Sequence, residues 1–163
     1  EKMNSDYISK FYEQYSKEVY LYTFSLCKNS HLAEDIMQEA FVRAILYLDD
    51  NHDNIKFWLF RVCRNLYIDY VRKNKIISQL DILDLHIEDT SLDVLKGIIK
   101  SESSLNLYNK VMSLPNTMKE VIVLFYYLEI PQNKIADIMN ISNGAVRTLI
   151  YRARKHLRSI MEE

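Results

Sequence analysis

The stretch PQNKIADIMNISNGAVRTLIYRARKHLR, residues 131–158, contains two helical patterns separated by a short break. Its first part carries apolar residues at helical spacing, namely Ile135, Ile138 and Met139. After them, Asn140 can adopt the left-handed conformation that ends a helix, and Ser142 can cap the next one. The pattern therefore predicts a helix, a tight turn and a second, longer helix, which together make a helix-turn-helix.

The second of these helices has an apolar face and a basic face. The apolar face consists of Val146, Leu149, Ile150, Ala153 and Leu157. The opposite face consists of Arg147, Tyr151, Arg154 and Arg158, flanked by Thr148, Arg152 and Lys155. Residues 141–158 hold five Arg or Lys residues and no carboxylate, although the chain's formal net charge is only −1. An α-helix fits the DNA major groove, where Arg can bind guanine through two hydrogen bonds and other cations contact phosphates. We therefore predict that this face binds DNA, although Arg147 taken alone could equally be a solvated arginine.

Helical periodicity extends over most of the chain, and alternating patterns typical of strands are missing from the sequence. We therefore expect an all-α fold. Besides the helix-turn-helix, we predict helices over about 6–27, from Asn29 or Ser30, over about 55–74, over 105–112 and over about 116–128. The helix that begins near Asn29 has the clearest apolar stripe: Ala33, Ile36, Met37, Ala40, Phe41, Ala44, Ile45 and Leu48. We expect Glu34 and Asp35 in its first turn, where the helix dipole favours carboxylates.

Charge is distributed unevenly along the chain. Residues 1–55 carry a net charge of −5, residues 56–75 +5, residues 76–106 −4 and residues 107–163 +3. Two basic segments suggest a polyanion held at two places, although a solvated helix face is the commoner cause of any single cluster. The segment 76–106 also shows no sustained apolar stripe. We therefore predict two small helical domains, residues 1–75 and 107–163, joined by an acidic linker over 76–106.

The composition argues against several classes of protein. No apolar run is long enough to cross a membrane, and residues 1–18 are too polar for a signal peptide, so we expect a cytoplasmic protein without membrane insertion. The four histidines show no ligand spacing, and we predict neither a metal nor another cofactor. We do not expect an enzyme, because no Gly-rich phosphate loop or catalytic grouping stands out. Cys27 and Cys63 are expected to be reduced, buried thiols.

The segment IKFWLFRVCRNLYIDYVRKNK, residues 55–75, interleaves aromatic and basic side chains. Its rings include Trp58, Phe60, Tyr67 and Tyr70, and its cations include Arg61, Arg64, Arg72 and Lys73. Rings beside cations suit single-stranded nucleic acid, because every base can stack on an aromatic ring. The alternative is that Trp58, Leu59, Val62 and Leu66 belong to the core and that the arginines are merely solvated.

Three segments in this order resemble the extracytoplasmic-function sigma factors, a group of the bacterial sigma-70 family. They are AEDIMQEAFVRAILYL at 33–48, FWLFRVCRNLYIDYVRKNK at 57–75 and LPNTMKEVIVLFYYLEIPQNKIADIMNISNGAVRTLIYRARKHLR at 114–158. The resemblance implies a protein that binds core RNA polymerase, recognises the −10 and −35 elements of promoter DNA and helps open the −10 duplex. It also implies a probable anti-sigma factor as a partner.

By position, the resemblance assigns roles to individual residues. Core polymerase would be bound by Asp35, Gln38 and Glu39. The −10 element would be bound by loop 49–54, Asn65, Arg72 and Lys73, together with Trp58, Arg61 and Arg64 of the aromatic basic segment. The −35 element would be bound by Arg147, Thr148, Tyr151, Arg152, Arg154 and Lys155. The chain departs from the family pattern at Asn140, where Gly is usual, and at Glu129, where Gly is common; both are turn positions.

The main alternative is a stand-alone helix-turn-helix regulator that binds a duplex operator without polymerase. Under that interpretation, the polar face of residues 31–46 and the aromatic basic segment would have no assigned function. A third interpretation is a polymerase-associated or membrane-associated adaptor without DNA specificity of its own, which would leave the Arg147 face unused.

Overall fold

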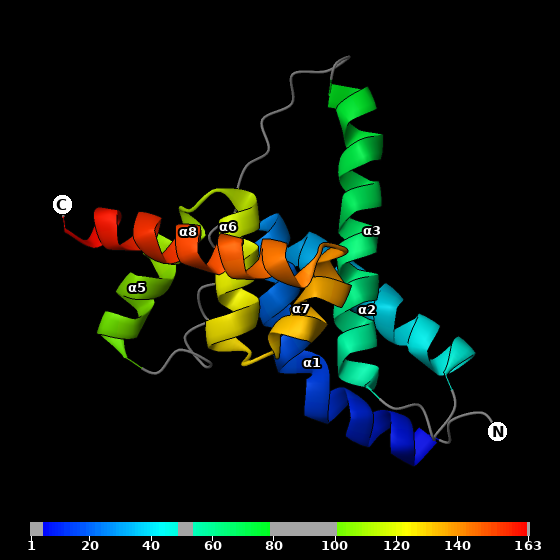
Figure 1. The fold of residues 1–163 in the computed structure, drawn as a ribbon. Helices are drawn as coiled ribbons and strands as arrows, with labels where there is room; N and C mark the ends of the chain where they lie inside the picture. The colour runs from blue at the N-terminus through cyan, green and yellow to red at the C-terminus, as the bar shows by residue number, and fades with distance from the viewer. Residues whose placement is uncertain (1–4, 49–53, 79–100, 163) are drawn as a thin grey trace. The chain divides into compact units, whose positions relative to one another are not determined.

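The computed structural model describes residues 5–48, 54–78 and 101–162, and every regular element among them is helical (Figure 1). The all-α prediction is therefore confirmed for the part of the chain described. The helices form two compact units, the first built from three helices and the second from the helices that follow residue 100. Each unit has its own apolar core, and each is described separately below.

The first unit packs three helices against one another: α1 (Ser5–Cys27), α2 (Ser30–Tyr47) and α3 (Ile55–Ser78). Aromatic rings join them, because Phe11 of α1 meets Phe41 of α2 edge to face at 5.4 Å between ring centroids. Tyr22 of α1 meets Phe60 of α3 in the same way at 5.2 Å. Edge-to-face pairs of this kind stabilise a core beyond the area that they bury. The apolar faces of α1, α2 and α3 thus meet in one small core.

Helix α2 follows its sequence pattern closely. The Asn29 side chain accepts a hydrogen bond of 3.0 Å from the backbone N–H of Leu32, so of the two expected starting residues it is Asn29 that caps the helix. The predicted stripe is buried at Ala33, Ile36, Met37, Ala40, Phe41, Ala44 and Leu48, and half-buried at Ile45. One expectation was wrong: because the helix begins at Ser30, its first turn ends before Glu34, and Glu34 and Asp35 lie in the second turn, where the dipole is weaker.

The two cysteines are free thiols, as expected, but only Cys63 is buried as predicted. Cys63 is fully buried between the helices of the first unit, and burial raises its pKa to about 12. Cys27 is half-buried at the end of α1, and its thiol donates to the carbonyl oxygens of Thr23, at 3.2 Å, and Asn29, at 3.3 Å. Both side chains therefore act as small packing groups.

The helices that flank the predicted linker extend into it. Helix α3 continues past the expected end at Asn74 to Ser78, and helix α5 (Glu102–Met112) begins before the expected Leu105. Ser101 caps α5, since its hydroxyl accepts a hydrogen bond of 3.1 Å from the N–H of Ser104. Residues 79–100 and 49–53 lie outside the described residues, and so do most of the predicted linker and loop. The domain boundaries at 75 and 107 remain predictions.

The second unit contains α5, α6 (Asn116–Ile122), a π-helical turn η2 (Val123–Tyr127), α7 (Gln132–Met139) and α8 (Asn143–Met161). The sequence predicted one continuous helix over 116–128. Instead, the helix widens after Ile122, and the N–H of Leu128 donates to the carbonyl oxygen of Val123 at 3.0 Å, five residues back. A π turn accommodates one extra residue within an otherwise α-helical path, so the side chains that follow it are rotated from their α-helical positions.

Among the residues that the structure describes, four that are not glycine have positive φ angles: Lys28, Asn54, Glu129 and Asn140. Asn140 is the residue expected to end the first helix of the helix-turn-helix, and its angles of φ 55° and ψ 49° confirm that expectation. The N–H of Ile141 then donates to the carbonyl oxygen of Ala136 at 3.0 Å, which closes a Schellman-type cap. Asn tolerates the left-handed region, whereas Glu pays the full steric cost of its Cβ there.

We predict that Glu129→Gly stabilises the chain, because Gly adopts φ 53° without a Cβ clash. Relief of the steric clash stabilises the folded state, whereas the greater conformational freedom of Gly stabilises the unfolded chain. The expected net gain in the free energy of unfolding is about 0.5–1 kcal/mol. Chemical denaturation monitored by circular dichroism measures it. Glu129→Ala is the matched control, since Ala keeps the Cβ and should give no gain; equal gains from the Gly and Ala variants would contradict the explanation.

Candidate nucleic-acid interface

Helices α7 and α8 form the helix-turn-helix predicted from residues 131–158. Ser142 caps α8, because its hydroxyl accepts a hydrogen bond of 3.1 Å from the N–H of Ala145. The apolar face of α8 packs on α6 and α7, and its fully buried members are Val146, Ile150 and Ala153. Leu149 and Leu157, also predicted for this face, are half-buried. The packing therefore fixes which side of α8 faces outward.

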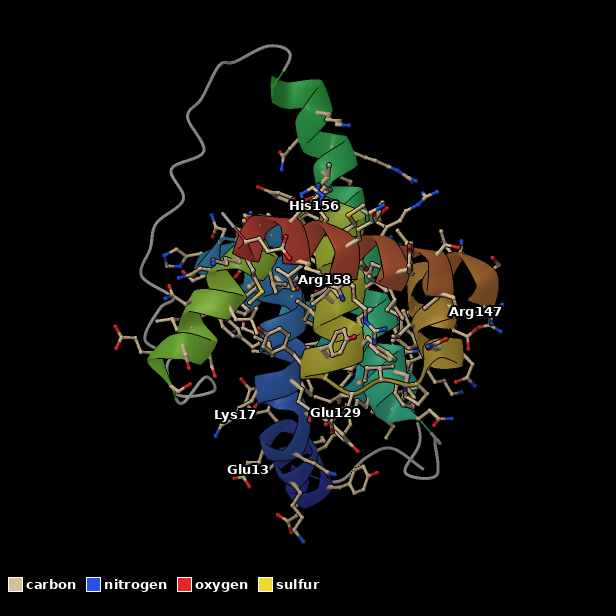
Figure 2. The ribbon with its side chains drawn as sticks, turned by 60° about the vertical axis from the view of Figure 1, so that its left-hand side comes forward. Glu13, Lys17, Glu129, Arg147, His156 and Arg158 are labelled. Carbon is tan, nitrogen blue, oxygen red and sulfur yellow. The ribbon has the colours of Figure 1, made fainter. Side chains whose placement is uncertain are left out.

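The outward side carries all six residues that the sequence assigned to the −35 element. Arg147, Thr148, Tyr151, Arg152, Arg154 and Lys155 are exposed. Figure 2 shows Arg147 near the N-terminal end of α8, with His156 and Arg158 near the opposite end. Thr148 is partly engaged within its own helix, since its hydroxyl donates to the carbonyl oxygen of Gly144 at 3.0 Å. With no carboxylate between 141 and 158, this face, from Arg147 to Arg158, is a positive surface about three turns long.

Arg154 differs from the other cations of this face, because it contacts another element. Its Nε–H donates to the hydroxyl of Tyr126 in η2, and its guanidinium carbon lies 5.2 Å from the centre of the Tyr126 ring. Sequence analysis gave Tyr126 no role. The only available signal was a run of aromatic residues at 125–127, and nothing in that run indicates a partner 28 positions further along the chain.

An apolar groove of about 720 Å³ lies beside this contact, between α5, η2 and the C-terminal half of α8. Its apolar wall includes Leu107, Val111, Ile122, Tyr127, Leu157 and Met161, and Arg154 and Arg158 stand at it as well. Leu107 and Met161 are exposed despite being apolar. The groove lies where α5 packs against α6 and α8. It was not predicted from the sequence.

In the first unit, helix α3 divides the aromatic basic segment between the core and the surface. Phe60 and Leu59 are fully buried, so they belong to the core. The side chains assigned to the −10 element are exposed at Arg61, Asn65, Arg72 and Lys73, and half-buried at Trp58 and Arg64. Tyr70 is also exposed. The helix therefore buries the Phe60 ring in the core and leaves Tyr70 and most of the cations at its surface.

The three residues assigned to polymerase binding lie on one outer side of α2. Asp35, Gln38 and Glu39 are all exposed, opposite the buried stripe. The Glu39 carboxylate accepts a hydrogen bond of 3.1 Å from Nε of Arg43, one turn further along the helix. Such an exposed i,i+4 pair contributes only a few tenths of a kcal/mol, so the carboxylate remains available to a partner.

Next to these polar residues, α2 exposes three large apolar side chains that sequence analysis did not single out: Val42, Leu46 and Tyr47. Together with Glu39, Arg43, Trp58 and Val62 they line a shallow cavity of about 400 Å³ between α2 and α3. Their position off the buried stripe was readable from the sequence and was the signal that could have identified them. An exposed apolar cluster rimmed by charges is typical of a protein-binding surface.

The described residues contain no cluster of three or more His, Cys, Asp or Glu side chains placed to hold a metal ion. None of the helices that the structure describes combines the length and the apolar character needed to cross a membrane.

Comparisons with known proteins agree with this geometry. Residues 11–76 match the family model for sigma-70 region 2, and residues 104–157 match the model for sigma-70 region 4. The ECF RNA polymerase sigma factor SigM of Bacillus subtilis is 34% identical over 94% of this chain and 94% of its own length. SigW of the same organism is 34% identical over 99% of this chain and 92% of its own length.

Two solved structures share the fold. The sigma factor RpoE of Bartonella quintana, in complex with the anti-sigma factor NepR, has a TM-score of 0.75 at 18% identity, covering 94% of this chain and 96% of its own. CnrH, in complex with the cytosolic domain of CnrY, has a TM-score of 0.67 at 21% identity, covering 98% of this chain and 90% of its own. The chain therefore belongs to the sigma-70 family, as an RNA polymerase sigma factor of the extracytoplasmic-function group.

We predict that Ser142→Ala weakens the helix-turn-helix, because it removes the acceptor for the N–H of Ala145 at the start of α8. The expected loss is about 1 kcal/mol of unfolding free energy, the usual cost of deleting an N-cap hydroxyl. Denaturant titration measures the loss. Ser142→Asp restores an acceptor and should recover most of it, whereas equal losses in the Ala and Asp variants would show that the hydroxyl has no capping role.

Proposed function

We propose that this sigma factor binds core RNA polymerase through α2, the −10 element through α3 and the −35 element through α8. The observation that carries the proposal is the outer side of α8, a row of exposed cations on a correctly capped helix-turn-helix. The proposed domains are 1–75 for polymerase and the −10 element and 107–163 for the −35 element, with an acidic linker between them. The chain would act by binding rather than by catalysis.

Recognition of the −35 duplex is assigned to α8 because the N-terminal part of the second helix enters the major groove in helix-turn-helix proteins. Arg147 lies in that part, and its guanidinium can donate two hydrogen bonds to one guanine. Arg152 and Lys155 lie further along, where cations contact phosphates and set position rather than sequence. Thr148 and Tyr151 complete the surface between them.

Capture of the −10 element is assigned to α3, since its outer side offers cations beside rings. Trp58 is half-buried, which leaves part of its ring for stacking while the rest anchors it in the protein. The exposed Arg61 and Asn65, with Arg64, supply donors, and Arg72 and Lys73 follow along the helix for the backbone. The loop 49–54, proposed to help hold a flipped base, lies almost entirely outside the described residues.

Polymerase binding is assigned to the polar side of α2, and the exposed apolar cluster beside it supports this assignment. Asp35, Gln38 and Glu39 are exposed and lie off the buried stripe, so the packing of α2 does not require them. The neighbouring Leu46 and Tyr47 expose apolar area that a partner protein could bury. A stand-alone repressor would have no use for this surface.

We also propose an anti-sigma factor as a partner and the cytoplasm as the location. Of the solved structures named above, the sigma factor RpoE is bound to the anti-sigma factor NepR, and CnrH is bound to the cytosolic domain of CnrY, which supports the first point. The cytoplasmic location follows from the proposed binding to core RNA polymerase. Reconstitution with core polymerase, followed by transcription from a genomic fragment library, tests the function as a whole: a stand-alone regulator would give no promoter-dependent initiation.

We predict that reversing the charge of Asp35 and Glu39 together, by substitution with Lys, weakens assembly with core polymerase by at least about tenfold. Truncating or reversing one side of an interfacial charge pair typically costs 2 kcal/mol or more. A pull-down with core polymerase measures assembly, and circular dichroism checks that α2 stays helical. The reversal of Asp6 and Glu13, both exposed on α1, is a control for net charge. Intact helicity with unchanged binding would refute the α2 assignment.

We predict that Arg147→Ala changes which −35 sequences support initiation, at a cost of about 1–3 kcal/mol on the preferred base. Arg158→Ala, at the far end of α8, should act weakly and uniformly, as loss of a phosphate contact does. Run-off transcription across a library of −35 variants measures both. Similar profiles for the two substitutions would defeat the base-reading role of Arg147.

A further inference from the structure

The π-helical turn η2 places an aromatic ring beneath one arginine of the DNA-binding face. In an α-helix, each residue advances by about 100° around the axis. The wider turn at Val123–Tyr127 changes that progression and leaves Leu124 buried, Phe125 and Tyr127 half-buried and Tyr126 exposed. Turns of this kind occur frequently at functional sites. Here the exposed residue is the one that meets α8.

The Tyr126 side chain is held on two sides. The ring of Phe125 stands at 86° to it, with 4.9 Å between centroids, which restricts its rotation from within η2. From α8, Nε–H of Arg154 donates to the Tyr126 hydroxyl, and the guanidinium carbon lies 5.2 Å from the ring centre. The arginine thus receives both a hydrogen bond and a cation–π contact from one residue.

This arrangement leaves the terminal nitrogens of the Arg154 guanidinium, the part proposed to bind DNA, without a hydrogen bond to Tyr126. A guanidinium has five N–H donors, and the hydrogen bond to Tyr126 uses only the one on Nε. The four donors on the two terminal nitrogens, which form the fork used for phosphate or guanine, are not used by it. Arg otherwise loses much of its rotamer freedom when it is fixed, and a side chain fixed before binding avoids part of that loss.

We propose that Tyr126 is a positioning residue for promoter recognition, which holds Arg154 in the orientation that it needs at the −35 element. The inference rests on the proposed assignment of Arg154 to that element and adds to it a residue from outside the helix-turn-helix. Tyr126 itself need not touch DNA. Its contribution is to the affinity and preference of Arg154, and it should therefore vanish when Arg154 is absent.

A double-mutant cycle in the assembled holoenzyme tests this. The full chain carrying Tyr126→Leu, Arg154→Ala or both is combined with core polymerase, and fluorescence anisotropy measures its affinity for a two-element promoter. Tyr126→Leu alone should weaken binding roughly three- to tenfold, the range expected for an exposed cation–π contact and one ordered side chain. In the Arg154→Ala background, the same change should have no further effect.

Tyr126→Phe provides a milder variant that keeps the ring and removes only the hydroxyl. It should lie between the wild type and Tyr126→Leu, and it keeps the test valid if the Leu variant folds poorly. Tyr12→Phe is the matched control, because Tyr12 is 43% exposed against 46% for Tyr126 and also packs its ring on a phenylalanine. It should leave promoter affinity unchanged.

Three results would overturn the inference. Only the third would also overturn the assignment of Arg154 to the −35 element. Additive losses from Tyr126→Leu and Arg154→Ala would show that Tyr126 acts independently of Arg154. Tighter promoter binding by Tyr126→Leu would show that the ring sequesters Arg154 from DNA. No effect of Arg154→Ala by itself would remove Arg154 from the −35 site and the inference with it, while the roles of Arg147 and the rest of α8 would stand.

Discussion

The burial of one face of α8 is the constraint on which the second unit depends. Val146, Ile150 and Ala153 pack against α6 and α7, and a fully buried Val or Ile side chain contributes about 1.5–3 kcal/mol. Because a helix is rigid, burying that face dictates where every other side chain of α8 points. Arg147 and Tyr151 face solvent as a consequence of where Val146 and Ile150 must lie. The core and the surface proposed to bind DNA are thus two sides of one helix, and the same packing fixes both.

The same logic operates in the first unit, where α2 and α3 each bury one side and present another. In α2, closely packed alanines such as Ala40 bring the helix near its neighbours and leave a polar side with a large apolar cluster at its end. In α3, Phe60 enters the core while Arg61 faces outward. Short turns with left-handed residues, Lys28 in this unit and Asn140 in the other, set the angles between the helices. The exposed sides of these helices, which are proposed to bind different partners, are therefore set by which sides are buried and by the turns that join the helices.

Sequence patterns predicted the parts of this structure that depend on local periodicity. The stripe of α2, the cap at Asn29, the turn at Asn140 and the two faces of α8 all follow from neighbours within one or two helical turns. Features that depend on tertiary packing were missed. The π turn adds one residue to a helix without changing the type of residue present, and the contact between Tyr126 and Arg154 joins two segments far apart in the sequence. The place of Arg154 on the basic face was predictable, whereas its partner was not.

The π turn also affects how the chain tolerates small changes in length. A helix that already holds one surplus residue would become an ordinary α-helix if a single codon between positions 123 and 127 were lost, because the wide turn absorbs that residue without changing the phase of the helix on either side. Val121 and Ile122 before the turn, and Leu128 after it, could then keep their places in the core. An in-frame deletion of one residue, which in a regular helix would turn one end by about 100° against the other, would here leave both ends in phase.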